Sequence, residues 1–134
     1  MAGGSRGLTA VAFGLLLAVG ATSAARIDPD AVIIFAPGAE RIGPADSATL
    51  EQIASMAKTG PEKWISLEAY AGAQGSRELN LALSQRRVDE VSHHLVALGV
   101  AASRIRETSY GDERIDESSL PMRRVEIRVR RLQL

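Results

Sequence analysis

The stretch YAGAQGSRELNLALSQRR, residues 70–87, joins a short strand-like segment to a long helix through a loop with two glycines. In its helical part, Asn80, Ser84 and Arg87 follow one another at spacings of four and three residues. Because an α-helix turns once every 3.6 residues, these polar side chains stack on one face, next to the loop. The stretch therefore predicts either a solvated helix face or a site for something small and polar.

Hydrophobic periodicity divides the rest of the chain into short strands and two helices. The expected strands are residues 31–36, 64–71, 104–111 and 123–132, and the expected helices are residues 44–58 and 77–98. In the longer helix, the residues expected to face the core are Leu81, Ser84, Val88, Val91, Leu95 and Leu98. The arginines of the last strand alternate with Val125, Ile127 and Val129, so they are expected on its exposed face.

The order strand, helix, strand, helix, strand, strand predicts an α+β fold. We expect a two-layer sandwich, with two main helices packed on one face of a mixed four-stranded sheet. The last connection is short for a helical crossover, so at least one strand pair should be antiparallel. A chain of 134 residues supports one such domain.

The N-terminal residues 1–25 have the composition of a secretory signal. Arg6 precedes the apolar run LTAVAFGLLLAV, and ATSAA supplies small residues for cleavage. The run is shorter than the roughly 20 residues that span a bilayer, so no stable transmembrane anchor is expected. The chain also lacks cysteine, and with it a site for lipidation. We expect a signal peptide at 1–25, a short segment at 26–31 and one domain at 32–134, located in the periplasm or associated with the outer membrane or cell wall.

The sequence gives little support to catalysis, metals or cofactors. His93 and His94 are the only histidines, and neighbours on a helix point about 100° apart, so they do not converge on one ion. There is no G-x-S-x-G motif, and GAQGS lacks the ending of a phosphate-binding loop. The balance of 16 basic and 16 acidic residues argues against a general nucleic-acid surface. We therefore expect neither an enzyme nor a nucleic-acid binder, with no catalytic residues, metal site or cofactor.

From Val32 to Arg131 the chain resembles the OmpA-like C-terminal domain, a module of outer-membrane proteins, peptidoglycan-associated lipoproteins and flagellar stator proteins. The residues that match its central motif are Gly75, Ser76, Asn80, Leu83, Ser84 and Arg87. Two further stretches, LGVAASRIRETSYGDE and MRRVEI, resemble the family's Tyr-Gly-Asp segment and its terminal strand. The resemblance covers nearly all of the chain after the expected signal.

This resemblance implies a non-catalytic site for the diaminopimelate side chain of peptidoglycan stem peptides, which carries a carboxylate and an ammonium. In the family, an arginine on the helix holds the carboxylate through two hydrogen bonds, and an aspartate pairs with the ammonium. Carried across, Arg87 is the carboxylate clamp. Asn80 is its hydrogen-bonding neighbour, and Arg124 is a second basic contact.

The chain departs from the family pattern at the other half of the clamp. The strand ending Gly-His-Thr-Asp reads Ala-Tyr-Ala-Gly here, which puts Tyr70 and Gly72 at the site and leaves Gly72 in place of the aspartate. Met122 stands where the terminal motif has asparagine. Half of the expected charge match is therefore missing.

Two hypotheses follow. In the first, the domain still binds peptidoglycan, weakly, and Glu68 or Glu78 reaches toward the vacant position. In the second, the fold serves as a periplasmic protein-interaction or assembly module whose partner is another envelope protein. Arg87 would then be structural, paired with Glu90 or with residues 112–113.

Overall fold

The computed structural model of the chain describes residues 3, 27–72, 75–112 and 120–132. Its elements are β1 (Ala31–Ile34), α1 (Pro44–Lys58), β2 (Lys63–Tyr70), α2 (Arg77–Ala97), the 3-10 turn η1 (Ala102–Arg104), β3 (Ile105–Gly111) and β4 (Arg124–Arg131). Every expected strand and helix is present, with its ends within two residues of the expected ones. The expected signal segment, residues 1–25, lies outside the described residues apart from Gly3.

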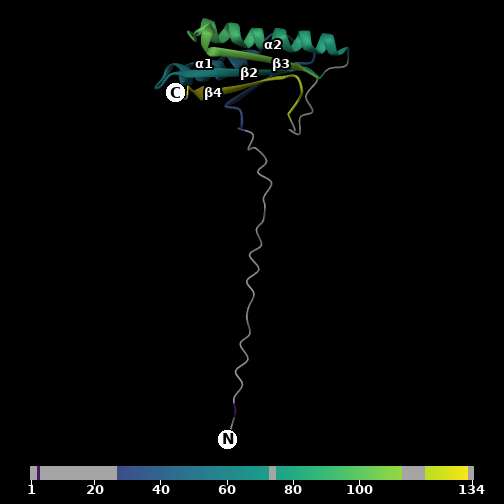
Figure 1. Cartoon of the computed structure of the whole chain (residues 1–134). Helices are drawn as coiled ribbons and strands as arrows, with labels where there is room; N and C mark the ends of the chain where they lie inside the picture. Colours follow the sequence, from purple (N-terminus) through teal and green to yellow (C-terminus); the bar gives the residue numbers. More distant parts are fainter. Residues whose placement is uncertain (1–2, 4–26, 73–74, 113–119, 133–134) are drawn as a thin grey trace.

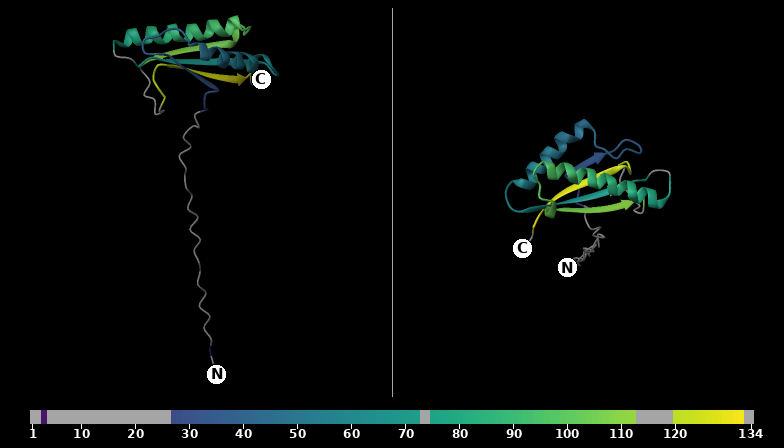
Figure 2. Two further views of the ribbon diagram at one scale, coloured as in Figure 1. Left: turned by 180° about the vertical axis from the view of Figure 1, so that it is seen from behind. Right: turned by 90° about the horizontal axis from the view of Figure 1, so that it is seen from above.

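The four strands form one mixed sheet in the order β1-β4-β2-β3. Strand β4 runs antiparallel to both of its neighbours, whereas β2 and β3 are parallel. Both helices cover the same face of the sheet, as Figures 1 and 2 show. The expected two-layer α+β sandwich is therefore confirmed.

The strand directions bring several connections to one end of the sheet. Strands β1, β2 and β3 run the same way, so their carboxyl ends meet the beginning of β4 there. We call this the loop end, formed by the residues that directly follow β1, β2 and β3 and directly precede β4. Helix α2 also begins there, since the loop after β2 leads into it.

Local signals at the helix ends explain the bounds of α1 and α2. Pro44 opens α1, and the backbone N–H of Gly43 donates to Asp46 Oδ2 over 3.0 Å. The Oγ of Ser76 accepts from the backbone N–H of Leu79 at 3.2 Å, which caps α2. After α2, Gly99 adopts a positive φ of 96°, a conformation that favours glycine at helix ends.

The core lies between the sheet and the helices. The fully buried core side chains of the sheet are Ile33, Ile65, Leu67, Ala69, Val125 and Ile127. The helices cover them with Leu50, Ile53, Ala54, Ala57, Val88, Val91 and Leu95. Burial of this apolar surface is the main stabilising contribution to a chain without cysteine.

The buried face of α2 differs from the expected one in its first three turns. Leu81 is 39% exposed, whereas Asn80 and Arg87 are only 2% and 1% exposed. Ser84, expected to face the core, is indeed fully buried. The expectation that Leu81 faces the core is wrong, and so is the alternative that the polar face is solvated. The physical reason is that this part of α2 packs on the polar loop end of the sheet, so polar side chains find hydrogen-bond partners inside.

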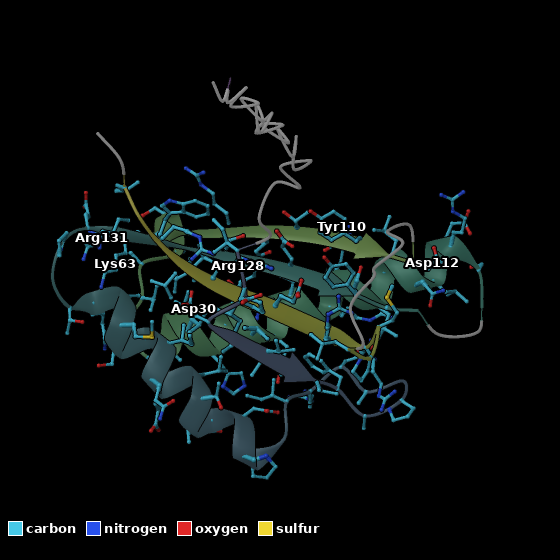
Figure 3. The ribbon with its side chains drawn as sticks, turned by 90° about the horizontal axis from the view of Figure 1, so that it is seen from below. Asp30, Lys63, Tyr110, Asp112, Arg128 and Arg131 are labelled. Atoms are coloured by element: carbon cyan, nitrogen blue, oxygen red, sulfur yellow. The ribbon has the colours of Figure 1, made fainter. Side chains whose placement is uncertain are left out.

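The face of the sheet opposite the helices carries charged and aromatic side chains (Figure 3). The expectation that the arginines of the last strand are exposed is wrong for Arg124, which is 1% exposed, and Arg128 and Arg130 are partly buried. The segment before β1 explains part of this burial, because Arg128 Nε donates to the carbonyl of Ile27 at 2.9 Å. We call this surface the open face.

Within residues 27–72, 75–112 and 120–132, no helix combines the length and the apolar character needed to cross a bilayer.

Candidate ligand site at the loop end of the sheet

A hollow of about 160 Å³ opens at the loop end. The described residues that line it are Pro37, Gly38, Gly72, Arg87, Met122 and Arg123. They follow β1, follow β2, precede β4 or belong to α2, so the strand order itself assembles the site. Pockets for drug-sized ligands measure roughly 300–1,000 Å³, so this hollow suits a group of few atoms.

Two wider hollows lie elsewhere on the described surface. One, of about 250 Å³, adjoins α1 near Lys58, and another, of about 480 Å³, lies between α2 and β3 beside Asp89 and Glu107. Neither is lined by any residue that the sequence assigned to a ligand site. The hollow at the loop end is therefore the candidate site, because Arg87 and Gly72, which the sequence assigned to a ligand site, line it.

Arg87 is held firmly in this site by uncharged partners. Its Nε donates to the carbonyl of Ala39 at 2.9 Å, and its Nη1 donates to the carbonyl of Tyr70 at 3.4 Å. The guanidinium carbon lies 5.1 Å from the centre of the Phe35 ring, within the range of a cation–π contact. The planar group is thus oriented by β2 and by the segment that follows β1.

The carboxylates expected to pair with Arg87 lie elsewhere. Glu90 Oε1 contacts His94 Nε2 at 3.3 Å and accepts from the backbone N–H of Ile42 at 3.4 Å. Asp112 accepts a hydrogen bond from Asn80. The expected pairing of Arg87 with Glu90 or Asp112 is therefore wrong, and no ion pair between described residues includes Arg87. Residue 113 lies outside the described residues.

The electrostatic environment of Arg87 is positive. Burial lowers the pKa of its guanidinium below the ordinary value, and repulsion from Arg123 lowers that pKa further. Glu40 raises the pKa, but its carboxylate already lies 2.6 Å from Arg86 Nε at the surface. Because two cationic side chains share one small hollow, an anion placed there would gain attraction from both.

Gly72 and Met122 both line the hollow and lie directly against each other. A Cβ atom added to Gly72 would lie 2.6 Å from Met122 Cβ and 2.9 Å from Met122 Cγ. Gly72 does not have a positive φ, so the obstacle to a side chain is the methionine and not the backbone. The two departures from the family motif are therefore neighbours in space, although they are 50 residues apart in sequence.

Asn80 and Ser84 form hydrogen bonds that join α2 to the end of β3. Neither is among the described residues that line the hollow. Asn80 Nδ2 donates to Asp112 Oδ2 at 3.0 Å, and Ser84 Oγ accepts from the backbone N–H of Gly111 at 3.1 Å. Figure 3 shows Asp112 beyond the tip of β3. Gly111 approaches the helix so closely that a Cβ would lie 3.0 Å from the backbone nitrogen of Leu81.

Tyr70 and Arg124 lie together on the open face. The Arg124 guanidinium carbon is 4.2 Å from the centre of the Tyr70 ring, and that ring stacks on Tyr110 with centres 5.2 Å apart. Arg124 Nη1 also donates to the carbonyl of Pro121 at 3.0 Å. The basic side chain that lines the hollow is instead that of Arg123, directly before β4, which the sequence reasoning missed. Because neighbours on an extended chain point to opposite sides, that alternation could have indicated it.

The two glutamates expected to reach toward the vacant position are also placed by the structure. Glu68 Oε2 lies 3.5 Å from Arg128 Nη1 on the open face, and Glu78 is exposed in the first turn of α2. Neither is among the described residues that line the hollow. The described lining thus contains two arginines and no acidic side chain.

Parts of this chain are similar in sequence to known proteins of the cell envelope. The chain is 34% identical over 79 residues to the probable lipoprotein YiaD of Escherichia coli, covering 59% of this chain and 36% of that protein. It is 41% identical over 66 residues to the peptidoglycan-associated lipoprotein of Brucella melitensis, covering 49% of this chain and 39% of the relative. The matched stretch therefore spans less than two fifths of either relative's own length.

Solved structures show the same arrangement. The peptidoglycan-associated lipoprotein from Burkholderia pseudomallei matches with a TM-score of 0.66 and 28% identity, over 74% of this chain and 89% of that one. The periplasmic domain of Helicobacter pylori MotB matches in fold, with a TM-score of 0.59 and 19% identity over 79% of each chain. The model of the OmpA family matches residues 34–128, which include all four sheet strands wholly or in part. The chain belongs to the OmpA family.

Proposed function

We propose that this domain binds peptidoglycan non-covalently, with Arg87 holding a carboxylate of a diaminopimelate-containing stem peptide in the hollow at the loop end. The observation that carries the proposal is that Arg87 lines a small hollow beside Arg123, with no carboxylate paired to it among the described residues. A guanidinium binds a carboxylate through two parallel hydrogen bonds, which gives both strength and orientation. The names of the relatives from Brucella and Burkholderia support the same class of ligand.

Binding by this site should be weaker than in a site with both charges. Gly72 supplies no carboxylate for an ammonium, and neither Glu68 nor Glu78 lines the hollow. Loss of one charged hydrogen-bond partner costs about 1.5–3 kcal/mol, which corresponds to roughly a ten- to hundredfold loss of affinity. The domain acts as a binding module without catalysis or a cofactor, in the periplasm or in association with the cell wall or the outer membrane.

One observation favours a second candidate function, a protein-interaction or assembly module of the cell envelope. Arg87 is 1% exposed and is held by Ala39, Tyr70 and the Phe35 ring, which is enough to explain it as a structural residue. In this alternative, the fold is kept while an envelope protein replaces peptidoglycan as the partner.

Retention on insoluble peptidoglycan separates the two candidates. The wild-type protein is compared with Arg123→Glu, which reverses a charge of the hollow, and with Arg131→Glu, which makes the same change at an exposed position near the far end of β4. We expect retention of the wild type and Arg131→Glu, and at least a fivefold lower bound fraction for Arg123→Glu. No retention of the wild type would favour the interaction module, and equal retention of all three would place the binding elsewhere.

A further inference from the structure

We propose that the hollow selects a carboxylate with a small apolar group beside it and no neighbouring ammonium. An N-acyl-alanine terminus has this chemistry, whereas a free amino acid head group does not. This inference rests on the proposed function, because it names which group of a stem peptide enters the site. It makes Met122 the residue that determines specificity.

The charges of the hollow carry the first step. Arg87 and Arg123 are its charged lining residues among those described, and both are cationic. Their mutual repulsion contributes to the lowered pKa of Arg87, so the site favours negative charge and opposes a further positive one. Glu40 offsets this only in part, since Arg86 holds its carboxylate outside the hollow.

The uncharged walls carry the second step. Besides the arginines, the described residues that line the hollow are Pro37, Gly38, Gly72 and Met122, none of which has a charged or hydroxyl side chain. An ammonium placed against these walls would lose hydration without gaining a charged partner. A methyl group would lose nothing and would gain contact with the adaptable thioether of Met122.

The contact between Gly72 and Met122 carries the third step. With a Cβ on residue 72 only 2.6 Å from Met122 Cβ, the methionine occupies the volume that any side chain at position 72 would need. The same residue therefore prevents an acidic group at this point and provides the apolar wall. The volume of about 160 Å³ that remains is large enough for a carboxylate and a methyl group.

Matched small probes test this selectivity in the protein recovered after export. N-acetyl-D-alanine and D-alanine differ in whether an ammonium lies beside the carboxylate, and meso-diaminopimelate provides the zwitterionic head group. Dissociation constants come from NMR titration of the ¹⁵N-labelled protein. We expect N-acetyl-D-alanine to bind at least fivefold more tightly than either of the other two.

The variant Met122→Asn and its matched control Met56→Asn test whether the Met122 side chain causes the preference for the acylated probe. Met56 is 42% exposed near the end of α1, and its carbonyl accepts from Lys63 Nζ at the start of β2, the end of that strand opposite the loop end. We expect Met122→Asn to bring the three constants within twofold of one another, and Met56→Asn to keep the wild-type ratio. Melting temperatures confirm that both variants are folded.

The possible outcomes distinguish a failure of this inference from a failure of the proposed peptidoglycan binding. Retention on insoluble peptidoglycan together with tighter binding of diaminopimelate, or with no binding of the acylated probe, would overturn the selectivity and leave the proposed function standing. Neither retention nor binding of any probe would overturn both. A preference for the acylated probe that survives in Met122→Asn would remove Met122 as its cause.

Discussion

Gly72 and Met122 illustrate how a pair of residues can alter a binding site together. From the sequence alone, Gly72→Asp looks like the restoration of a lost charge. In the structure, the new side chain would collide with Met122, whose Cβ lies 2.6 Å from the position of the added Cβ. A substitution at position 72 alone therefore produces a steric clash with Met122.

We predict that Gly72→Asp alone destabilises the domain by about 1–3 kcal/mol, the usual cost of overpacking. It should not improve the binding of diaminopimelate. The double variant Gly72→Asp/Met122→Asn should regain stability and bind diaminopimelate about tenfold more tightly than the wild type, as expected for one restored charged partner. Urea unfolding and calorimetry measure the two quantities. Tighter binding by the single variant would show that Met122 is no obstacle.

Gly111 provides a second prediction at this scale. It has a φ of 58°, and a Cβ would meet the backbone of Leu81 at 3.0 Å. Gly111→Ala should therefore add a steric cost to the roughly 1–2 kcal/mol of a left-handed alanine.

Gly38→Ala is the control for that prediction. Gly38 has a similar φ of 71° and nothing within 4 Å of its Cβ position, so this variant reports the backbone cost alone. We expect Gly111→Ala to lower the free energy of unfolding by at least about 1 kcal/mol more than Gly38→Ala. Equal losses of unfolding free energy in the two variants, measured by urea unfolding, would mean that the close approach of β3 to α2 adds no steric cost to the substitution.

At the scale of elements, α2 consists of two parts that face the sheet differently. Its later turns bury Val88, Val91 and Leu95, while its first turns bury Asn80 and Ser84. This arrangement makes Arg87 part of the packing as well as part of the candidate site. Because this polar face is buried, a substitution of Arg87 should affect the stability of the fold as well as ligand binding.

We predict that Arg87→Ala lowers the free energy of unfolding by about 1–3 kcal/mol, because it leaves the carbonyls of Ala39 and Tyr70 without their donors. The neighbouring Arg86 is the matched control, since it is 52% exposed and forms a surface pair with Glu40. Arg86→Ala should cost at most about 1 kcal/mol. Equal losses of unfolding free energy for the two substitutions, measured by urea unfolding, would contradict the claim that the buried contacts of Arg87 stabilise the fold.

The elements themselves were predictable because their signals are local. Pro44 and the apolar period define α1, and Ser76 and Gly99 flank α2. The orientation of α2 was not predictable, because a polar residue that faces a polar end of a sheet has the same sequence pattern as one that faces water. Arg124 was misjudged for the same reason, since its burial depends on Tyr70 and Pro121, which only the folded sheet brings near.

The candidate site was predictable in part. The helix motif indicated Arg87, which does line the hollow, and the strand end indicated Gly72, which lies in the same wall. The contact of Gly72 with Met122 and the contribution of Arg123 depend on the pairing of β2 with β4. A contact between residues 50 positions apart produces no periodic pattern in the sequence, so a single sequence does not reveal it.

At the scale of the whole molecule, the proposed location depends on residues 1–25. We predict that the exported protein begins near Arg26, because a short apolar run followed by small residues is typical of a cleaved signal. The intact mass of protein recovered from the periplasm tests this directly. A full-length mass, found only in detergent-extracted membranes, would indicate an uncleaved anchor instead.

The most direct measurement of the central claim is a residue-resolved NMR titration of the domain with soluble muropeptides. If the hollow at the loop end binds the stem peptide, the largest shifts should fall on the amides of Gly72 and Arg123, the methyl group of Met122 and the Nε–H of Arg87. Trp64 and Arg106, which contact each other on β2 and β3, should be unaffected. Shifts confined to such residues, or no shifts at saturating muropeptide, would contradict peptidoglycan binding through Arg87.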